Sequence, residues 1–318
     1  MSELVKVQYL SELDQSMQPA WVLPAEGTEK RPLAVCLHTW SYDIEGGYNE
    51  FVNRCRQYNF HMIFPLFRGP NWNPDACGSD LVVSDLSCAV TYMQENYAVD
   101  PEKIYLVGGS GGGHASLLMA GRKPELFTAI SSWCPISDLI AWFQEVNEKK
   151  KDRPRRTYDD HIFEACGGNP RTNPNAAAQA KHRSPLTWLA NATDKVILDI
   201  GTGIHDGHTG SVPISHAVNA FNRVAKPEDR ISQEDIDYMV QYEKIPAHLQ
   251  FNGEDPAYGE NKVLLRKASG KVRLTLFEGG HQILEGPAFG FLDRQLRDAE
   301  PVWCSGNAAG GKATELTK

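Results

Sequence analysis

The chain has 318 residues, of which 41% are hydrophobic and 23% are charged, and its formal net charge at pH 7 is -8. This length and composition exclude a wholly disordered chain and suit one large α/β domain or two smaller ones. The negative net charge argues against nucleic acid as a main partner, because phosphate recognition needs a basic surface.

Taken in chain order, the predicted elements alternate between strands and helices. Apolar runs predict strands at 5–10, 19–24, 32–38, 61–65, 103–108, 127–135, 194–203 and 271–280. Helical spacing of apolar residues predicts helices at 48–59, 79–97, 111–124, 214–225 and 288–299. The alternation predicts a doubly wound, mainly parallel sheet, with the first two strands forming an antiparallel edge.

Two intervals interrupt this alternation, at 138–193 and 226–262. Insertions of this kind lie at strand ends, beside the ligand crevice of an α/β sheet. We expect the first to form a cap after the sixth strand and the second to form a peripheral helical excursion. The basic run at 148–156 could attract an acidic polymer, but a solvated face is the commoner role of such a run. The whole is interpreted as one domain over 1–305, followed by a flexible tail at 306–318.

Composition also bears on compartment and ligands. The N-terminus lacks the basic-then-apolar pattern of a signal peptide, and no apolar run is long enough to cross a bilayer. These features favour a cytoplasmic protein without a membrane partner, although a secreted mature form would look the same. Seven cysteines occur without any C-x-x-C pair, so neither a zinc knuckle nor a dithiol redox site is expected. Their odd number fits a reducing compartment and leaves room for one disulfide.

The segment KIYLVGGSGGGHASLLMA, at 103–120, surrounds one serine with five glycines. A phosphate-binding loop would need Lys and then Ser or Thr after the glycines, and a dinucleotide fingerprint would need a glycine at position 114. The pattern G-x-S-x-G fits 108–112 and describes a tight strand-to-helix turn that exposes a serine hydroxyl. The plain alternative is a glycine-rich turn with an incidental serine. The predicted strand before it and helix after it favour Ser110 as a nucleophile.

A serine nucleophile needs a base, and the base needs an acid to hold its tautomer. In this architecture the chain order is Ser, then Asp or Glu, then His. Asp206 stands just past the strand at 194–203, whereas Asp199 lies inside it. His281 follows the last predicted strand, and we expect it to be the base rather than a satisfied surface or core histidine. The sequence HDGH around Asp206 suggests a metal, but no regular element fixes its spacing, so no metal is expected.

On these residues the chain resembles the α/β-hydrolase superfamily, and within it the esterase and prolyl-oligopeptidase-like branch (peptidase S9 type). The resemblance covers most of residues 33 to 295 and is carried by the segments at 99–120, 183–189, 199–217 and 276–281. It implies an α/β-hydrolase fold, an acyl-enzyme mechanism with Ser110, Asp206 and His281, and no cofactor. The chain departs from the branch behind the acid, where residues 207–211 separate Asp206 from a Val-Pro pair that usually follows more closely.

An oxyanion hole needs two backbone N–H groups, of which Gly111 is expected to supply one. Many relatives carry His-Gly-Gly in the loop after the third strand, whereas this chain has His38-Thr39-Trp40. Position assigns the second N–H to Trp40, with Thr39 as the next candidate. The indole of Trp40 could wall a small acyl pocket, although packing is the commoner role of a Trp.

One further basic residue is a candidate for substrate binding. Arg68 could bind a substrate carboxylate, although a structural ion pair is the favoured alternative.

The expected activity is therefore hydrolysis of carboxylic esters, and the resemblance favours a small-molecule or carbohydrate ester of the acetyl type. The alternative is a serine exopeptidase of the prolyl-oligopeptidase-like type, for which no Glu-Glu anchor of the dipeptidyl-peptidase kind is evident. A binding protein without turnover is the third hypothesis, and an intact set of Ser, Asp and His argues against it.

Overall fold

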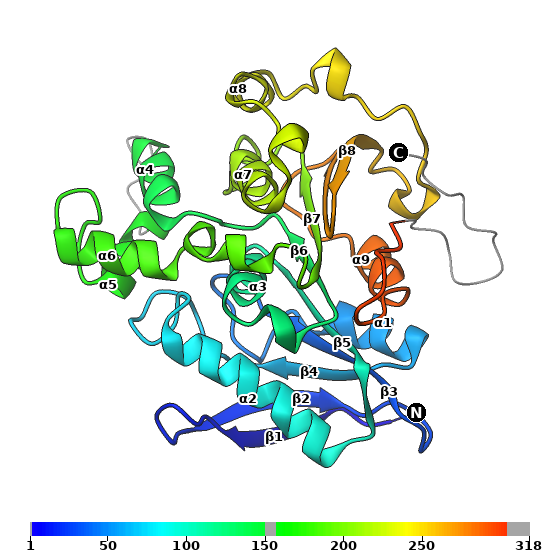
Figure 1. The fold of residues 1–318 in the computed structure, drawn as a ribbon. Helices are drawn as coiled ribbons and strands as arrows, with labels where there is room; N and C mark the ends of the chain where they lie inside the picture. Colours follow the sequence, from blue (N-terminus) through cyan, green and yellow to red (C-terminus); the bar gives the residue numbers. More distant parts are fainter. Residues whose placement is uncertain (1, 150–156, 304–318) are drawn as a thin grey trace.

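A computed structural model describes residues 2–149 and 157–303 of the chain. Within these segments nine strands form one sheet in the order β1-β2-β4-β3-β5-β6-β7-β9-β8 (Figure 1). The strands are β1 (Val5–Leu10), β2 (Met17–Leu23), β3 (Arg31–Leu37), β4 (His61–Pro65), β5 (Val99–Gly109), β6 (Ala129–Trp133), β7 (Ile197–Gly203), β8 (Val263–Ser269) and β9 (Val272–Phe277).

The central strands β4, β3, β5, β6, β7 and β9 are parallel to one another. They are buried on both faces, which explains why they read as continuous apolar runs in the sequence. The first hairpin, β1 and β2, pairs antiparallel with β4, as predicted. Strand β8 was not predicted, and it adds a second antiparallel edge beside β9. The doubly wound, mainly parallel sheet is confirmed.

Helices cover both faces of the sheet. They are α1 (Asn49–Tyr58), α2 (Asp80–Asn96), α3 (Gly111–Arg122), α4 (Leu139–Lys149), α5 (Tyr158–Cys166), α6 (Pro174–Arg183), α7 (Ser215–Val224), α8 (Gln233–Tyr242) and α9 (Glu285–Leu292). Helices α2, α3 and α7 supply apolar side chains to the larger core on one face, whereas α1 and α9 lie side by side on the other (Figure 1). Ser79 caps α2, because its Oγ accepts a hydrogen bond from the N–H of Val82.

The two insertions are helical. Helices α4, α5 and α6 fill the interval between β6 and β7 and form a third apolar cluster together with Trp40. Asp138 begins α4, since its Oδ1 accepts hydrogen bonds from the N–H groups of Ile140 and Ala141. The second interval contains α8, which is capped by Ser232 and packs on α7. Most of the basic run at 148–156 and the predicted tail at 306–318 lie outside the described residues.

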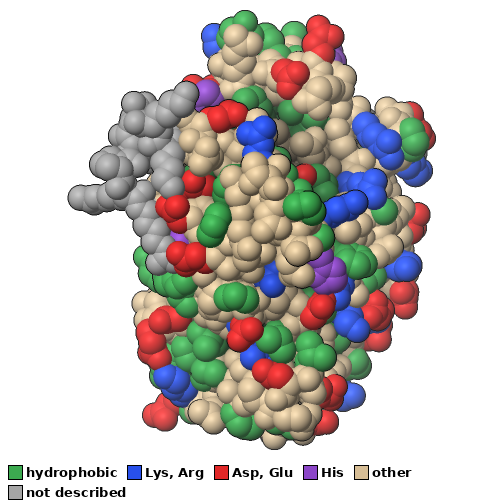
Figure 2. Space-filling model, turned by 90° about the vertical axis from the view of Figure 1, so that its left-hand side faces the viewer, with side chains coloured by type: hydrophobic (Ala, Val, Ile, Leu, Met, Phe, Trp, Pro, Cys, Tyr) green, Lys and Arg blue, Asp and Glu red, His purple; other side chains and the backbone are tan. Residues whose placement is uncertain are grey.

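The surface mixes side chains of both charge signs. Figure 2 shows acidic, basic and apolar side chains interspersed on the face that it presents. In the part of the chain that the structure describes, no helix is both long enough and apolar enough to cross a membrane. The six cysteines of this part are buried free thiols, and Cys304 lies outside it.

Candidate active site

Ser110 occupies the turn between β5 and α3 in a strained backbone conformation. Its φ is 56° and its ψ is -116°, a region that non-glycine residues rarely adopt and that costs about 1–3 kcal/mol. The turn is held because the N–H of Ser110 donates a 2.8 Å hydrogen bond to the carbonyl of Trp133, at the end of β6. The residue is half-buried, whereas the glycines on both sides of it are buried. The strained turn predicted from G-x-S-x-G is therefore present.

The neighbouring glycines are required by close backbone approach rather than by unusual dihedral angles. A Cβ on Gly108 would lie 2.6 Å from the carbonyl carbon of Gly112, across the turn. A Cβ on Gly112 would lie 2.8 Å from the carbonyl oxygen of Leu37, at the end of β3. Side chains at these positions would push α3 away from the sheet edge, so the glycines seat the helix directly under the serine.

The structure brings Asp206 and His281 together. The Oδ2 atom of Asp206 lies 2.7 Å from Nδ1 of His281, and the carboxylate is almost fully buried. The other oxygen, Oδ1, accepts hydrogen bonds from the N–H groups of Gly207 at 2.9 Å and Val212 at 3.2 Å. Because Asp206 accepts the proton of Nδ1, Nε2 is the ring nitrogen left to accept a proton from another group.

The electrostatics of His281 follow from these contacts. Burial by itself lowers the pKa of His281, but the hydrogen bonds with Asp206 and with the thiol of Cys134 outweigh it. The net effect raises the pKa of the imidazole above its ordinary value of 6.5. A carboxylate in this position stabilises the imidazolium that forms when the histidine takes a proton.

The five residues between Asp206 and the Val-Pro pair fold back over the acid and base. A Cβ on Gly210 would overlap with Oδ1 of Asp206 and with Cβ of His281, so only glycine fits there. The next residue, Ser211, is held by the first insertion, because Nε1 of Trp142 in α4 donates a 2.8 Å hydrogen bond to the carbonyl of Ser211. Residues 207–211 therefore fold around Asp206 and His281, and the hydrogen bond between these two residues is kept.

Cys134 links this pair to the serine, and the sequence did not reveal it. It directly follows Trp133, whose carbonyl anchors Ser110, and it has a positive φ of 44°. Its Sγ donates a 3.2 Å hydrogen bond to the carbonyl of Gln282, in the loop that carries His281. Cys134 lies inside the strand predicted at 127–135, whereas β6 ends one residue before it.

Among the described residues, the trio of Cys134, Asp206 and His281 is the group whose possible metal-ligating atoms lie close together, within 4.8 Å of one another. Coordination of an ion would require the 2.7 Å hydrogen bond between Asp206 and His281 to open. We therefore assign these atoms to hydrogen bonding, and we assign no metal.

The expected oxyanion donors lie next to each other. A Cβ on Gly111 would overlap with the backbone N of Trp40 and lie 2.5 Å from its Cα, so the two backbones are in direct contact. Within residues 2–149 and 157–303, neither N–H donates to a protein acceptor. The loop is fixed by His38, whose ring nitrogens bond the carbonyls of Thr39 at 2.8 Å and Leu66 at 2.7 Å. Two adjacent, unengaged N–H groups at a strand end are what an oxyanion hole requires.

The indole of Trp40 packs against helices α4 and α5 of the first insertion. It is 2% exposed, its ring centroid lies 4.8 Å from that of Trp142, and Tyr158 packs nearby at 6.3 Å. Its Nε1 donates a 3.2 Å hydrogen bond to Nδ1 of His161 in α5. The packing alternative therefore describes this side chain, and its contacts tie the oxyanion loop to α4 and α5.

Arg68 is engaged in structural ion pairs. Its Nε lies 2.7 Å from Oδ2 of Asp85, and its Nη1 lies 2.7 Å from Oδ2 of Asp14. Its Nη2 contacts both carboxylates as well, and the Asp85 side chain is fully buried. Because all three guanidinium nitrogens are taken, the ion-pair alternative holds, and we leave Arg68 out of the substrate site.

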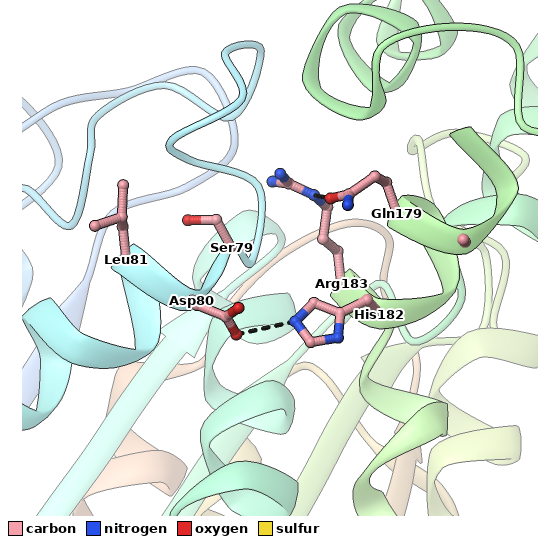
Figure 3. A pocket seen from close by; sticks show the side chains of 7 residues that line it. Ser79, Asp80, Leu81, Gln179, His182 and Arg183 are labelled. Atoms are coloured by element: carbon pink, nitrogen blue, oxygen red, sulfur yellow. Dashed lines mark hydrogen bonds and ion pairs between the residues drawn. The ribbon is translucent and has the colours of Figure 1, made fainter. Parts of the chain in front are cut away.

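A pocket of about 480 Å³ lies away from these residues. Figure 3 shows it between the first turn of α2 and the last turns of α6, where Asp80 faces His182 at 2.9 Å. Arg122 holds the same carboxylate oxygen at 2.8 Å. Among the lining residues, Nε of Arg183 donates a 3.2 Å hydrogen bond to Oε1 of Gln179, and none of Ser110, Asp206 and His281 lines the pocket.

Comparison with known proteins assigns one segment of the chain to a family. Residues 79–168 match the Prolyl oligopeptidase family, a segment that contains Ser110 and ends before Asp206 and His281. A search of curated proteins found no match.

Solved structures share the fold. An acylaminoacyl peptidase of Pyrococcus horikoshii superposes with a TM-score of 0.62 at 15% identity, covering 95% of this chain and 43% of that one. A puromycin-hydrolyzing peptidase of Mycobacterium tuberculosis gives a TM-score of 0.59 at 15% identity, covering 95% and 41%. Prolyl oligopeptidase B of Galerina marginata gives 0.54 at 15% identity, covering 77% and 32%. The chain thus spans less than half the length of these structures.

Proposed function

We propose that the chain is a serine hydrolase with a prolyl-oligopeptidase-like catalytic domain, and that it cleaves small carboxylic esters through Ser110, His281 and Asp206. The α/β-hydrolase fold shared with the solved structures and the family match over residues 79–168 support the proposal. The observation that carries the proposal is the 2.7 Å hydrogen bond between a buried Asp206 and His281, together with the strained turn that holds Ser110 between β5 and α3. Serine is a weak nucleophile without a base, and in this proposal His281 is the base and Asp206 orients it.

In the proposed first half-reaction, Nε2 of His281 takes the proton of the Ser110 hydroxyl as Oγ attacks the ester carbonyl. The carbonyl oxygen becomes an oxyanion that accepts hydrogen bonds from the N–H groups of Gly111 and Trp40. Collapse of the tetrahedral intermediate breaks the bond to the leaving group, which receives the proton from His281 as an alcohol. An acyl-enzyme on Ser110 remains.

In the proposed second half-reaction, His281 takes a proton from water, and the resulting hydroxide attacks the acyl carbonyl. The same two N–H groups hold the second oxyanion, and Ser110 regains its proton as the carboxylic acid leaves. Asp206 stays ionised throughout and holds the imidazole in the tautomer with a proton on Nδ1.

A small acyl group is proposed because the loop expected to complete the oxyanion hole carries a bulky tryptophan at position 40, and its backbone lies against Gly111. We do not carry the expected carbohydrate leaving group forward, since the relatives named above are peptidases. A serine peptidase is the second candidate, and the match to the Prolyl oligopeptidase family favours it. Both candidates use the same residues and differ in the leaving group.

The test compares wild type with Ser110→Ala on p-nitrophenyl acetate, longer p-nitrophenyl esters and an aminoacyl p-nitroanilide. A fluorophosphonate probe followed by mass spectrometry locates the nucleophile. Ser116→Ala is the matched control, because Ser116 lies in the same helix and its hydroxyl only bonds the carbonyl of Gly112 at 2.7 Å. Ester turnover that vanishes only in Ser110→Ala, with one adduct on Ser110, supports the proposal. Anilide cleavage exceeding ester cleavage selects the peptidase, and neither turnover nor adduct refutes both.

A further inference from the structure

His205, the residue before Asp206, is bonded at both ring nitrogens to carboxylates. Its Nδ1 lies 2.7 Å from Oε2 of Glu243, and its Nε2 lies 2.7 Å from Oε1 of Glu278. Neither contact involves the carboxylate of Asp206, which bonds His281. The two neighbouring side chains therefore serve different partners.

The two carboxylates come from separate parts of the fold. Glu243 ends α8 in a left-handed conformation with φ 52°, inside the second insertion. Glu278 follows β9 and stands three residues before His281. The backbone reinforces the second link, because the N–H of His205 donates a 3.0 Å hydrogen bond to the carbonyl of Gly279. His205 thus joins the loop of the acid, the loop of the base and α8.

The charge state of His205 fits this arrangement. The hydrogen bonds with Glu278 and then Glu243 raise the pKa of His205 above its ordinary value, against a smaller opposing effect of burial. A protonated imidazole donates from both nitrogens, so it satisfies both carboxylates at once. A neighbouring side chain, His208, places its Nδ1 3.6 Å from Oε1 of Glu243 and its Nε2 2.6 Å from the carbonyl oxygen of Val240.

The energy of these pairs does not by itself explain their geometry. The side chains of His205 and Glu243 are about one-third exposed, and that of Glu278 is about half exposed. Exposed ion pairs contribute on the order of 0–1 kcal/mol to stability. Their effect on the catalytic rate can be much larger than their effect on stability. A misplacement of about 1 Å in an active site costs on the order of 100-fold in rate.

We propose that His205 is a positioning residue that holds the Asp206 loop against the His281 loop and couples both to α8. This inference rests on the proposed function, in which Asp206 must orient His281. It gives the second insertion, which carries none of the proposed catalytic residues, a role in catalysis through Glu243.

The test is His205→Gln, which can donate a hydrogen bond to only one of the two carboxylates with good geometry. His248→Gln is the matched control, since His248 lies in the insertion that carries Glu243 and pairs with Asp235 at 3.3 Å on an exposed surface. Ester turnover should fall about 10- to 100-fold in kcat for His205→Gln with KM changed less than about twofold, and His248→Gln should match wild type.

The pH profile separates positioning from general stability. Wild-type kcat should decline on the alkaline side as His205 loses its proton and releases one carboxylate, and this decline should be absent from His205→Gln. Glu278→Gln and Glu243→Gln provide a second route, because each keeps the shape of the side chain while weakening one ion pair. Each should lower kcat by several-fold at a temperature far below unfolding.

The outcomes of the inference and of the proposed function are distinguishable. If wild type turns over esters and labels on Ser110, but the His205, Glu243 and Glu278 variants all keep wild-type kcat and pH profile, the positioning role is wrong and the proposed function stands. If His205→Gln does not fold, the two glutamine variants at 243 and 278 decide in the same way. If wild type neither turns over nor labels, the proposed function fails and this inference fails with it.

Discussion

Substituting Gly111 with alanine would disturb the expected oxyanion hole without removing any side chain. The new Cβ would lie 2.5 Å from Cα of Trp40 and 3.0 Å from the carbonyl carbon of Thr39, and it would overlap with the backbone N of Trp40. Cβ atoms essentially never approach other atoms within 3.0 Å, so the two backbones must separate by about 0.5 Å or more. All three atoms belong to the main chain, so no side-chain rotation can relieve the clash.

The size of the effect follows from which groups move apart. Gly111 and Trp40 are the two proposed oxyanion donors, and loss of one such donor costs about 100- to 1000-fold in kcat, or about 2.7–4 kcal/mol. Overpacking also lowers the free energy of unfolding by about 1–3 kcal/mol. Replacing glycine by alanine in a helix returns up to about 1 kcal/mol of this.

Gly121→Ala is the matched control for the loss of stability. Gly121 lies near the other end of the same helix, and its Cβ would lie 2.6 Å from the carbonyl carbon of Trp188. We expect Gly121→Ala to lower the melting temperature as Gly111→Ala does but to keep kcat within about twofold of wild type. The assay measures kcat on p-nitrophenyl acetate per fluorophosphonate-titrated site, alongside thermal unfolding. A Gly111→Ala variant with wild-type kcat, or an equal loss of kcat in both variants, would refute the reasoning.

Three further predictions concern the hydrogen bond between Asp206 and His281, the thiol of Cys134 and the ion pairs of Arg68. Asp206→Asn should lower kcat by about 10,000-fold. Because Asp206 raises the pKa of His281, the rise of rate with pH should shift to lower pH in this variant. An unshifted pH profile would contradict the pairing of Asp206 with His281. Cys134→Ala should lower kcat about fivefold by freeing the loop of His281, and Cys134→Ser, which keeps a donor, should restore most of it; equal rates in both would argue against a positioning role. Arg68→Met should cost about 3–5 kcal/mol of unfolding free energy by leaving Asp85 buried and unpaired, with KM unchanged; a raised KM at unchanged melting temperature would instead restore the substrate-binding interpretation.

The sequence predicted the central sheet well because burial on both faces leaves a simple signal. Strands β3, β4 and β6 are short and mainly apolar, β5 ends in an apolar run, and each predicted strand overlaps the observed one. Strand β8 was missed because it lies at the edge of the sheet. Its burial alternates irregularly, and its sequence VLLRKAS mixes apolar and charged residues after a long polar interval. Edge strands of this kind carry no pattern that separates them from loops.

The candidate site was predictable where backbone geometry and chain order constrain it. The turn at Ser110 has a glycine signature because three backbone segments meet there, and Asp206 and His281 stand where the parallel strands β7 and β9 end. The roles of these residues stay predictions, although the structure brings the acid and base into contact. Cys134 and His205 could not be found in the same way. Their partners lie up to 148 residues away, and neither spacing nor residue type encodes such contacts.

Both insertions form hydrogen bonds with the loop that carries Asp206. Contacts that would select the substrate are therefore linked to contacts that position the acid. From the cap, Trp142 bonds the carbonyl of Ser211, and from the second insertion, Glu243 bonds His205. Trp142 also packs against Trp40, beside the expected oxyanion donor. Substrate contacts would come from the same cap, since insertions at strand ends lie over the ligand crevice of such sheets. A change at Trp142 in the first insertion should therefore alter kcat together with KM, because the segment that would select the substrate also positions the acid and the oxyanion loop.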